Sequence, residues 1–262
     1  MIHSDFHIHS ELSFDSDEPM TEVCRIAQAR RLTEICFTDH HDLHEGGGTL
    51  SLPDYMSALA AVRERFPQMN IRSGIELGYD PKAHMRMLDD LALLAPDYIL
   101  LSVHAVNGVD PFFADTYYKN RSRAEGLEDY LRAVLEAAEL VEDFDAMAHV
   151  GYAARYAPEG EEPAPLSYDD APDLIDTIFE CLIRKDKALE VNTGQDLPIP
   201  GADMLLRYRE MGGTLIVLGS DAHQAKNIGR NFKETIALLL KLGFTTHCTF
   251  AGRNRTLHPL TV

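Results

Sequence analysis

The chain has 262 residues, of which 45% are apolar and 25% charged, and its 42 acidic against 24 basic side chains give a formal charge of −18. This composition is typical of a globular protein, and the length fits one domain spanning residues 1–262. So acidic a chain disfavours nucleic acid and anionic membranes as partners, because phosphate backbones are bound by lysine and arginine. A phosphorylated substrate would require a locally positive site.

The N-terminal residues lack the basic and apolar regions of a signal peptide, and no apolar run approaches the length of about 18 residues that would span a membrane. We therefore expect a soluble, cytoplasmic protein. The four cysteines form no Cys-x-x-Cys pair and lie in apolar segments, so we expect reduced, buried thiols.

Short apolar segments alternate with stretches of helical periodicity along the whole chain. We predict strands at 2–8, 33–38, 71–77, 97–103, 144–149, 188–192, 214–219 and 244–250. The clearest helical patterns cover 20–31, 123–142 and 173–185. Alternation of this kind predicts an α/β fold, and seven or eight units predict a closed (β/α) barrel.

Two loops are unusual in composition. Residues 157–172 are rich in Pro, Gly and Glu, which predicts a long surface loop between the fifth strand and its helix. Residues 107–123 are aromatic and basic in an otherwise acidic chain. This second stretch is either a packed loop or a lid over a substrate.

Potential metal ligands gather at the ends of the predicted strands, which form the catalytic face of a barrel. The first strand ends with His7 and His9, and this spacing places both imidazoles on one side of an extended strand, about 6–7 Å apart along the chain. Later strands end with Asp39, His40 and His41, with Glu76, with His104, with His149, and with Asp221 and His223. Imidazoles beside a few carboxylates, without thiolates, favour Zn, Mn or Fe over Ca or Mg.

Seven of the twelve histidines lie at these strand ends. If these seven histidines had only a structural role, several imidazoles would lie at the open end of the barrel without hydrogen-bond partners, which is energetically costly. We therefore predict a metal site there. The other five are expected to be structural or exposed: His3, His44, His84, His247 and His258.

The ordered motifs resemble the PHP (polymerase and histidinol phosphatase) family of metallohydrolases. They are a His-x-His, a Thr-Asp-His, a glutamate, two single histidines and a final Ser-Asp-Ala-His, and they span residues 5–223. The resemblance implies a distorted, TIM-like (β/α)7 barrel that holds up to three divalent metals at the C-terminal ends of its strands.

The resemblance also implies three sets of metal ligands, called sites A, B and C below. Site A would use His7, His9, Glu76 and Asp221. Site B would use Glu76, His104 and His149, so that Glu76 bridges the two metals. Site C would use His40, His223 and Asp15, with Asp17 as the alternative to Asp15. His41 is expected to support the ligands from behind or to face solvent.

Clustered divalent metals activate water and neutralise a phosphoryl group, so we predict hydrolysis of a phosphomonoester by a metal-bridging hydroxide. Glu76 would take part by bridging the metals of sites A and B. Asp39 is a candidate for orienting the ligands or for passing a proton to the leaving alkoxide. Arg155 is the preferred phosphate-binding residue because guanidinium pairs well with phosphate. Weaker candidates are Lys119, Arg121, Arg123 and Arg230.

Within the family, segments 117–131 and 149–156 are most similar to the histidinol-phosphatases of histidine biosynthesis, which implies L-histidinol phosphate as the substrate. Those enzymes carry an arginine shortly after an Asn-Thr-Gly type of sequence, where this chain has Gln195 and Asp196. Either another basic residue takes that place or the substrate is a different small phosphomonoester.

Other classes are less well supported. A nucleic-acid module conflicts with the charge. A Ser-His-Asp hydrolase built on Ser220, Asp221 and His223 is geometrically poor, and Gly-x-Ser-x-Gly is absent. A metal-storage role gives no reason for ligands to converge on one open face. A metal-dependent amidohydrolase-like enzyme remains an alternative.

Overall fold

In the computed structural model, which describes residues 3–44 and 47–261, ten strands form one sheet. Residue 2 of the first predicted strand and the side chain of His84 lie outside the described part. The strands are β1 (Ser4–Ile8), β2 (Glu34–Phe37), β3 (His40–Asp42), β4 (Asn70–Gly78), β5 (Tyr98–Ser102), β6 (Ala146–Met147), β7 (Ala188–Asn192), β8 (Ile216–Gly219), β9 (Thr246–Ala251) and β10 (Asn254–Pro259).

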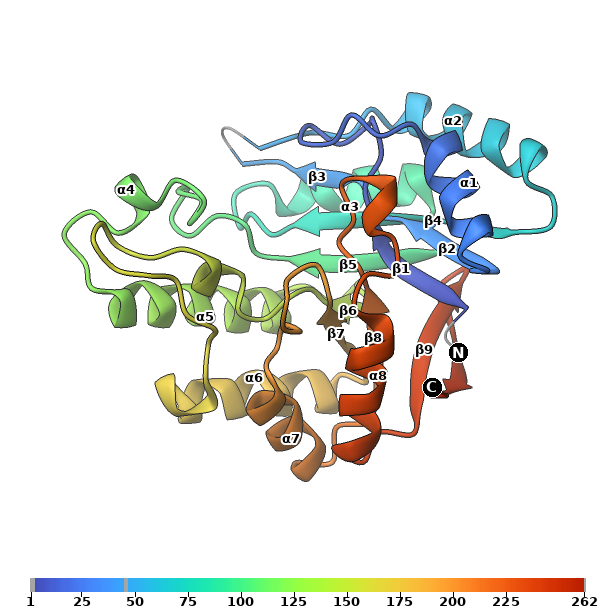
Figure 1. Ribbon diagram of the computed structural model, residues 1–262. Helices are drawn as coiled ribbons and strands as arrows, with labels where there is room; N and C mark the ends of the chain where they lie inside the picture. Colours follow the sequence, from blue (N-terminus) through green and yellow to red (C-terminus); the bar gives the residue numbers. More distant parts are fainter. Residues whose placement is uncertain (1–2, 45–46, 262) are drawn as a thin grey trace.

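Helices lie between the strands along the chain and flank the sheet (Figure 1). The α-helices are α1 (Met20–Ala29), α2 (Leu52–Arg65), α3 (His84–Leu94), α4 (Ala114–Tyr117), α5 (Arg123–Leu140), α6 (Pro172–Arg184), α7 (Ala202–Glu210) and α8 (Phe232–Lys241). Three short 3-10 helices are η1 (Tyr152–Arg155), η2 (Tyr168–Asp170) and η3 (Ala225–Asn227).

The strand order is β1-β2-β4-β5-β6-β7-β8-β9-β10, with β3 pairing β4. All of these pairs are parallel except β9 with β10. Parallel pairing needs a crossover connection, which the intervening helices supply, and it buries both faces of the strands. The predicted alternation is thus confirmed as a mixed α/β fold with a central parallel sheet.

The C-terminal end of β1 is hydrogen-bonded to the segment that follows β8. The N–H of His9 donates to the carbonyl of Ala222 at 3.0 Å, and the N–H of Asp221 donates to that of His7 at 2.8 Å. These bonds bring the beginning and the end of the parallel series together. An apolar cluster also unites side chains of seven strands with Ala148: Phe6, Cys36, Tyr98, Leu100, Ala146, Ala188, Val217, Cys248 and Phe250.

Every predicted strand has a counterpart, and the three predicted helices correspond to α1, α5 and α6. Two strands were not predicted. β3 consists of three polar residues, and β10 is largely exposed, so neither carries the apolar alternation by which strands are recognised. Most of the predicted surface loop at 157–172 has no regular structure and is exposed, as expected.

The state of the four cysteines confirms the expectation from the sequence. Cys24, Cys36, Cys181 and Cys248 are all free and buried, as predicted.

Helix α5 begins at a capping box, in which Ser122 and Glu125 each accept a hydrogen bond from the other's backbone N–H. Among the described residues, no helix is both long enough and apolar enough to cross a membrane.

Candidate metal centre and substrate cavity

The residues predicted for site A meet where β1, β4 and the segment after β8 converge. His7 Nε2 lies 3.0 Å from His9 Nε2 and 3.2 Å from Glu76 Oε2. Asp221 Oδ1 lies 3.5 Å from His7 Nε2 and 3.3 Å from His9 Nε2. Ligands bound about 2.0–2.2 Å from one ion are about 3.0–3.5 Å apart in octahedral or tetrahedral geometry. His7, His9 and Glu76 therefore have the mutual spacing of a metal site, and Asp221 lies close to both imidazoles.

Site B is built on the other oxygen of Glu76. Oε1 lies 2.9 Å from His149 Nε2 and 3.1 Å from His104 Nε2, and these two nitrogens are 3.4 Å apart. Because Oε1 faces site B while Oε2 faces site A, Glu76 has the geometry of a bridge. Strand β4 places it there in a fully buried position.

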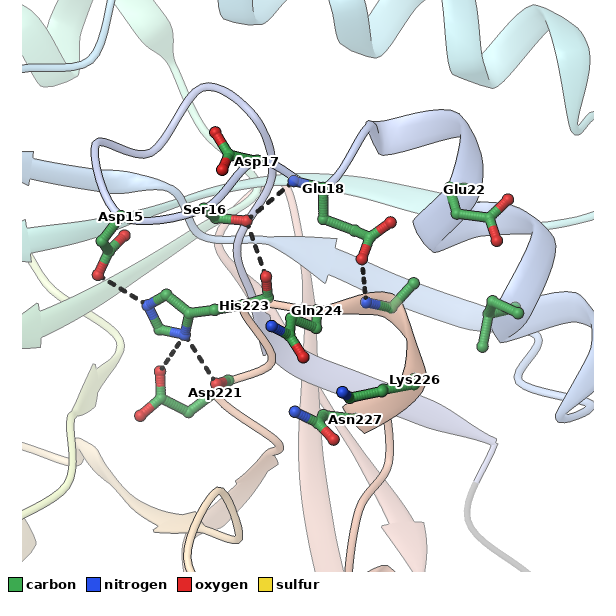
Figure 2. Close-up of a pocket in the computed structure, with 12 residues that line it drawn as sticks. Asp15, Ser16, Asp17, Glu18, Glu22, Asp221, His223, Gln224, Lys226 and Asn227 are labelled. Atoms are coloured by element: carbon green, nitrogen blue, oxygen red, sulfur yellow. Dashed lines mark hydrogen bonds and ion pairs between the residues drawn. The ribbon is translucent and has the colours of Figure 1, made fainter.

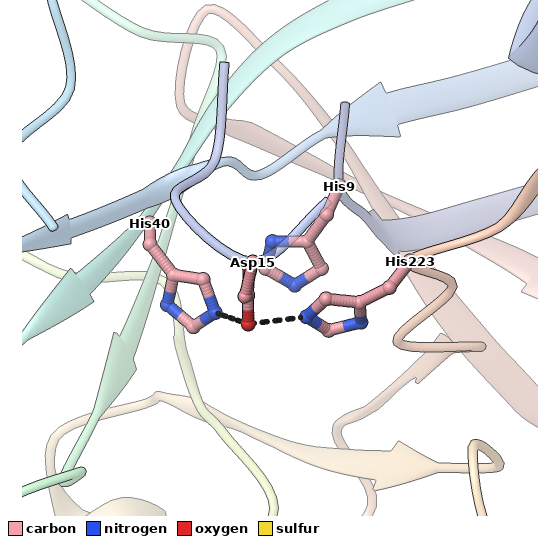
Figure 3. A group of neighbouring side chains, drawn as sticks. All are labelled: His9, Asp15, His40 and His223. Atoms are coloured by element: carbon pink, nitrogen blue, oxygen red, sulfur yellow. Dashed lines mark hydrogen bonds and ion pairs between the residues drawn. The ribbon is translucent and has the colours of Figure 1, made fainter. Parts of the chain in front are cut away.

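Site C contains four neighbouring side chains (Figure 3). Asp15 Oδ2 lies 2.9 Å from His223 Nε2 and 3.4 Å from His40 Nε2. The ring of His9 stacks on those of His40 and His223, at centroid distances of 4.4 and 4.1 Å. Asp17 is not part of this group and lies apart from His223 (Figure 2). Of the two alternatives, the structure thus brings Asp15 to the other ligands.

Burial and mutual interactions set the charge of the cluster. Burial alone would raise the pKa of Glu76, but the surrounding imidazoles, His7 foremost, lower that pKa well below its usual range. The pKa of Asp221 is likewise lowered against the effect of burial, mainly by His7. Burial and the neighbouring His223 lower the pKa of His9 to about 3. Ionised carboxylates and unprotonated imidazoles are the forms that bind divalent cations. Against the effect of burial, Asp42 and Glu76 raise the pKa of His104 to about 10, so that imidazole must lose a proton when a cation binds.

Glu190 supports the ligands and was missed from the sequence. Its Oε1 lies 2.5 Å from His7 Nδ1, and its Oε2 accepts the backbone N–H of His149 at 2.7 Å. A Cβ at Gly219 would lie 2.3 Å from the Cβ of His7 and 2.5 Å from Glu190 Oε1, so only glycine leaves room for this pair. A glutamate inside the buried strand β7 was the available signal.

Asp39 lies behind the ligands and does not line the cavity above them. Its Oδ1 accepts the N–H of Ser10 at 2.6 Å and the hydroxyl of Ser13 at 2.9 Å. Ser13 Oγ is in turn 3.0 Å from His9 Nδ1. Burial raises the pKa of Asp39 to about 6. This position supports the predicted orienting role, whereas the alternative role of passing a proton to the leaving group lacks a path to the cavity.

His41 is turned away from the metal ligands. Its Nε2–H donates to Asp90 on α3 at 3.0 Å, and its Nδ1 accepts the N–H of Leu50 at 3.2 Å. The residue is only 1% exposed, so the expectation that it faces solvent is wrong. Its side chain thus connects β3 to α3 and to the segment before α2.

A cavity of about 470 Å³ lies above the three sites. Its walls contain aromatic side chains, Asp110 and Arg155, and its floor contains seven of the candidate metal ligands: Asp15, His40, Glu76, His104, His149, Asp221 and His223. The aromatic wall residues are Phe14, Phe112, Phe113, Tyr152 and Tyr156. A second, more open cavity of about 730 Å³ lies beside site C, and Asp15, Asp221 and His223 border both (Figure 2).

Arg155 enters the substrate cavity from η1, as predicted. Its Nη2 lies 3.2 Å from Asp221 Oδ2 and donates to Asn192 Oδ1 at 3.3 Å. Its Nε is buried and has no hydrogen-bond partner among the described residues. No other arginine or lysine of the described chain lines this cavity. The guanidinium is therefore held in place with a donor left for an anion.

The other basic candidates lie outside the cavity. Lys119 is exposed, and Arg121 pairs with Asp129 at 3.1 Å. Arg230 pairs with Asp196 at 2.7 Å, and Arg123 donates to the carbonyl of Ala164. The prediction that Lys119 and Arg121 bind substrate is therefore not supported. Within the stretch at 107–123, only the part up to Thr116 lines the cavity.

The five histidines expected to be structural or exposed differ in position. His44 lines the substrate cavity, with Nε2 3.9 Å from Asp42 Oδ1, so it lies closer to the site than expected. His247 is buried, and its ring lies 5.6 Å from that of His258. His3 is exposed, with Nδ1 3.4 Å from the carbonyl of Arg31.

Carboxylates and imidazoles gathered at the C-terminal ends of parallel strands, beneath a cavity that contains an arginine, are the donor set of a metal-dependent hydrolase. The chain belongs to the PHP domain family, whose model matches residues 5–194. A histidinol-phosphatase of Lactococcus lactis subsp. lactis is 29% identical over 255 residues, which cover 95% of this chain and 94% of that protein. The crystal structure of histidinol phosphate phosphatase from the same organism, complexed with Zn, L-histidinol and phosphate, is similar with a TM-score of 0.90. It is 28% identical, and the match covers 97% of this chain and 98% of that one.

Proposed function

We propose that this chain is a metal-dependent phosphomonoesterase of the histidinol-phosphatase type, which converts L-histidinol phosphate and water to L-histidinol and phosphate. One observation carries the proposal: ligands of sites A, B and C form the floor of a single cavity, and Arg155, with its unpartnered Nε, stands in the wall of that cavity. The similarity over nearly the whole chain to a protein crystallised with Zn, L-histidinol and phosphate supports it.

Two or three divalent metals, Zn, Mn or Fe, would be held at sites A, B and C by the side chains described above. When bound, such metals supply an activated water and neutralise the charge of the phosphoryl group. Arg155 would bind an outer phosphate oxygen, because Asp221 and Asn192 hold its guanidinium beside site A. Glu76, Asp39 and Glu190 would keep the imidazoles in place.

The walls of the cavity suit the other end of the substrate. L-histidinol carries an ammonium group and an imidazole. Asp110 is anchored by the hydroxyl of Tyr152 at 2.9 Å and by the N–H of Phe112 at 2.8 Å, and it supplies a carboxylate for the ammonium. Phe112 and Phe113 are each 61% exposed, and such rings can stack on an imidazole. A substrate would thus be bound at both of its ends.

We also infer that the sheet closes into a distorted, TIM-like (β/α)7 barrel and that residues 1–262 form one PHP-type domain. Two observations support closure: the hydrogen bonds between β1 and the segment after β8, and the apolar cluster shared by seven strands. A single domain is supported because Arg253, between β9 and β10, pairs with Asp145 beside β6. An enzyme of amino-acid biosynthesis would act in the cytoplasm.

The test is a phosphatase assay of the metal-reconstituted protein. L-histidinol phosphate should be hydrolysed with a kcat/KM well above that of sugar and nucleotide phosphates, and amide substrates should not be cleaved. Preference for another small monoester would overturn the histidinol assignment and would agree with Gln195 and Asp196 standing where an arginine was expected. Cleavage of amides alone would favour the amidohydrolase-like alternative.

A further inference from the structure

Asp42, at the end of β3, contacts two imidazoles that belong to different metal sites. Its Oδ1 lies 2.9 Å from Nδ1 of His104 in site B, and its Oδ2 lies 3.1 Å from Nδ1 of His40 in site C. We propose that Asp42 is a positioning residue shared by these two sites, so that metal binding at B and at C depends on one carboxylate. The inference rests on the proposed metal sites and requires no particular substrate.

The opposite nitrogens of the same rings face the metal positions. His104 Nε2 lies 3.1 Å from Glu76 Oε1, and His40 Nε2 lies 3.4 Å from Asp15 Oδ2. A neutral imidazole carries one N–H and one lone pair. A carboxylate beside Nδ1 keeps the proton there and leaves the lone pair of Nε2 free to bind a cation. The contact with Asp42 therefore favours the metal-binding tautomer of His104, and the nearness of Asp42 Oδ2 to His40 Nδ1 favours the same tautomer of that ring.

The two contacts differ in quality. His104 Nδ1 makes a hydrogen bond to Asp42. His40 Nδ1 lies near Asp42 and also 3.2 Å from Glu76 Oε2, but neither contact is aligned as a hydrogen bond, and the atom is buried. A proton held at this nitrogen has only carboxylates close enough to accept it, and a small rotation of the ring would align it with Asp42.

The backbone around Asp42 fixes the direction of its carboxylate. Asp42 faces Gly78 in the ladder between β3 and β4, where a Cβ would lie 1.7 Å from Asp42 Oδ1. On the other side, a Cβ at Gly47 would lie 2.7 Å from the Cβ of Asp42. The N–H of Asp42 donates to the carbonyl of Gly48 at 2.9 Å. Glycine at 47 and 78 thus leaves space for this side chain, which is only 2% exposed.

Glu190 provides the matched control. It is also a buried carboxylate beside a ligand, but it contacts the imidazole of one ligand only, His7 of site A. Its other oxygen accepts a backbone N–H, that of His149. Removing the charge of Glu190 should affect site A, whereas removing that of Asp42 should affect B and C together.

The experiment is cadmium NMR of the cadmium-reconstituted protein, which gives one resonance for each occupied site. His149→Ala and His223→Ala assign the resonances of B and C. Asp42→Asn retains one acceptor oxygen and gains an NH2 group, so both resonances should shift or disappear, with the affinity of B and C reduced by about 10–100-fold. The resonance of A should persist and should move no further than it does in His149→Ala, which alters B at the other end of the Glu76 bridge. Glu190→Gln should move the resonance of A and leave that of C unchanged.

A change at only one of B and C, or an equal change at all three sites, overturns the proposal. If Asp42→Asn does not fold, Gly78→Ala replaces it, because the added methyl would displace the carboxylate, and the same pair of resonances must change. Since the spectrum requires no turnover, loss of the histidinol-phosphatase assignment would leave this result standing. A wild-type protein that binds no cadmium would remove both the metal sites and the inference.

Discussion

Replacing Arg155 by alanine should weaken the binding of a phosphomonoester and leave the metals in place. The guanidinium is held by Asp221 at 3.2 Å and Asn192 at 3.3 Å, and its buried Nε has no partner among the described residues. An unsatisfied buried donor is costly, and a phosphate oxygen would satisfy it. The alanine variant removes this donor together with the cation nearest to site A.

The size of the effect follows from the type of bond. A hydrogen bond to a charged group contributes about 1.5–3 kcal/mol, and each 1.4 kcal/mol corresponds to about tenfold in an equilibrium constant. KM for L-histidinol phosphate should therefore rise by about 10–100-fold in Arg155→Ala. Arg155→Lys should recover part of this loss, because lysine keeps the charge but not the forked geometry of the guanidinium.

Steady-state kinetics combined with elemental analysis of the metals provide the measurement. Arg230→Ala is the control, because Arg230 pairs with an exposed aspartate and does not line the cavity. Its KM should match that of the wild type. An unchanged KM in Arg155→Ala, with full metal content, would refute the assignment of this residue to phosphate binding. Loss of metal would instead mean that Arg155 acts by holding Asp221.

Four further substitutions test other parts of the site. Glu76→Gln should abolish turnover and lower the metal content at both sites it joins, since an amide cannot offer an anionic oxygen to each, and elemental analysis would record the loss. Asp15→Asn should release the metal of site C, whereas Asp17→Asn should retain full content; the opposite result would mean that the wrong aspartate was chosen. His41→Ala should reduce the free energy of unfolding by about 1–3 kcal/mol, because it leaves the buried N–H of Leu50 without its acceptor and removes a partner of the partly exposed Asp90. Denaturant titration would measure this loss, and a fall in metal content would show that His41 supports the ligands after all.

The meeting of the candidate metal ligands could be predicted because their positions follow from topology. Parallel strands joined by helices end on the same face, so polar residues at successive strand ends meet there even when they are far apart in sequence. Strand β3 escaped prediction because His40, His41 and Asp42 carry no apolar alternation. Glu190 escaped because its role depends on meeting His7, which is 183 positions away. Side-chain partners over that distance are not encoded in any local pattern.

The segment at 107–123 shows a different limit of prediction from sequence. Its composition left open whether it is a packed loop or a lid over a substrate, and its first part does line the cavity. The charged part, however, turns back to its own helix, where Arg121 meets Asp129. Neither periodicity nor spacing shows which side of a loop faces a ligand. The choice between Asp15 and Asp17 was open for the same reason.

Metal ions at sites A and C would link segments of the chain that are far apart in sequence, at the junction where β1 is hydrogen-bonded to the segment after β8. Site C joins Asp15 to His223, which are 208 positions apart, so a cation bound there closes a loop that contains most of the protein. A ligand that binds only the folded state, at about 1,000 times its dissociation constant, adds about 4.1 kcal/mol to the free energy of unfolding. During synthesis, sites A and C cannot be completed until Asp221 and His223 have left the ribosome. Metal supply would then determine how long the folded chain survives as well as how fast it turns over substrate.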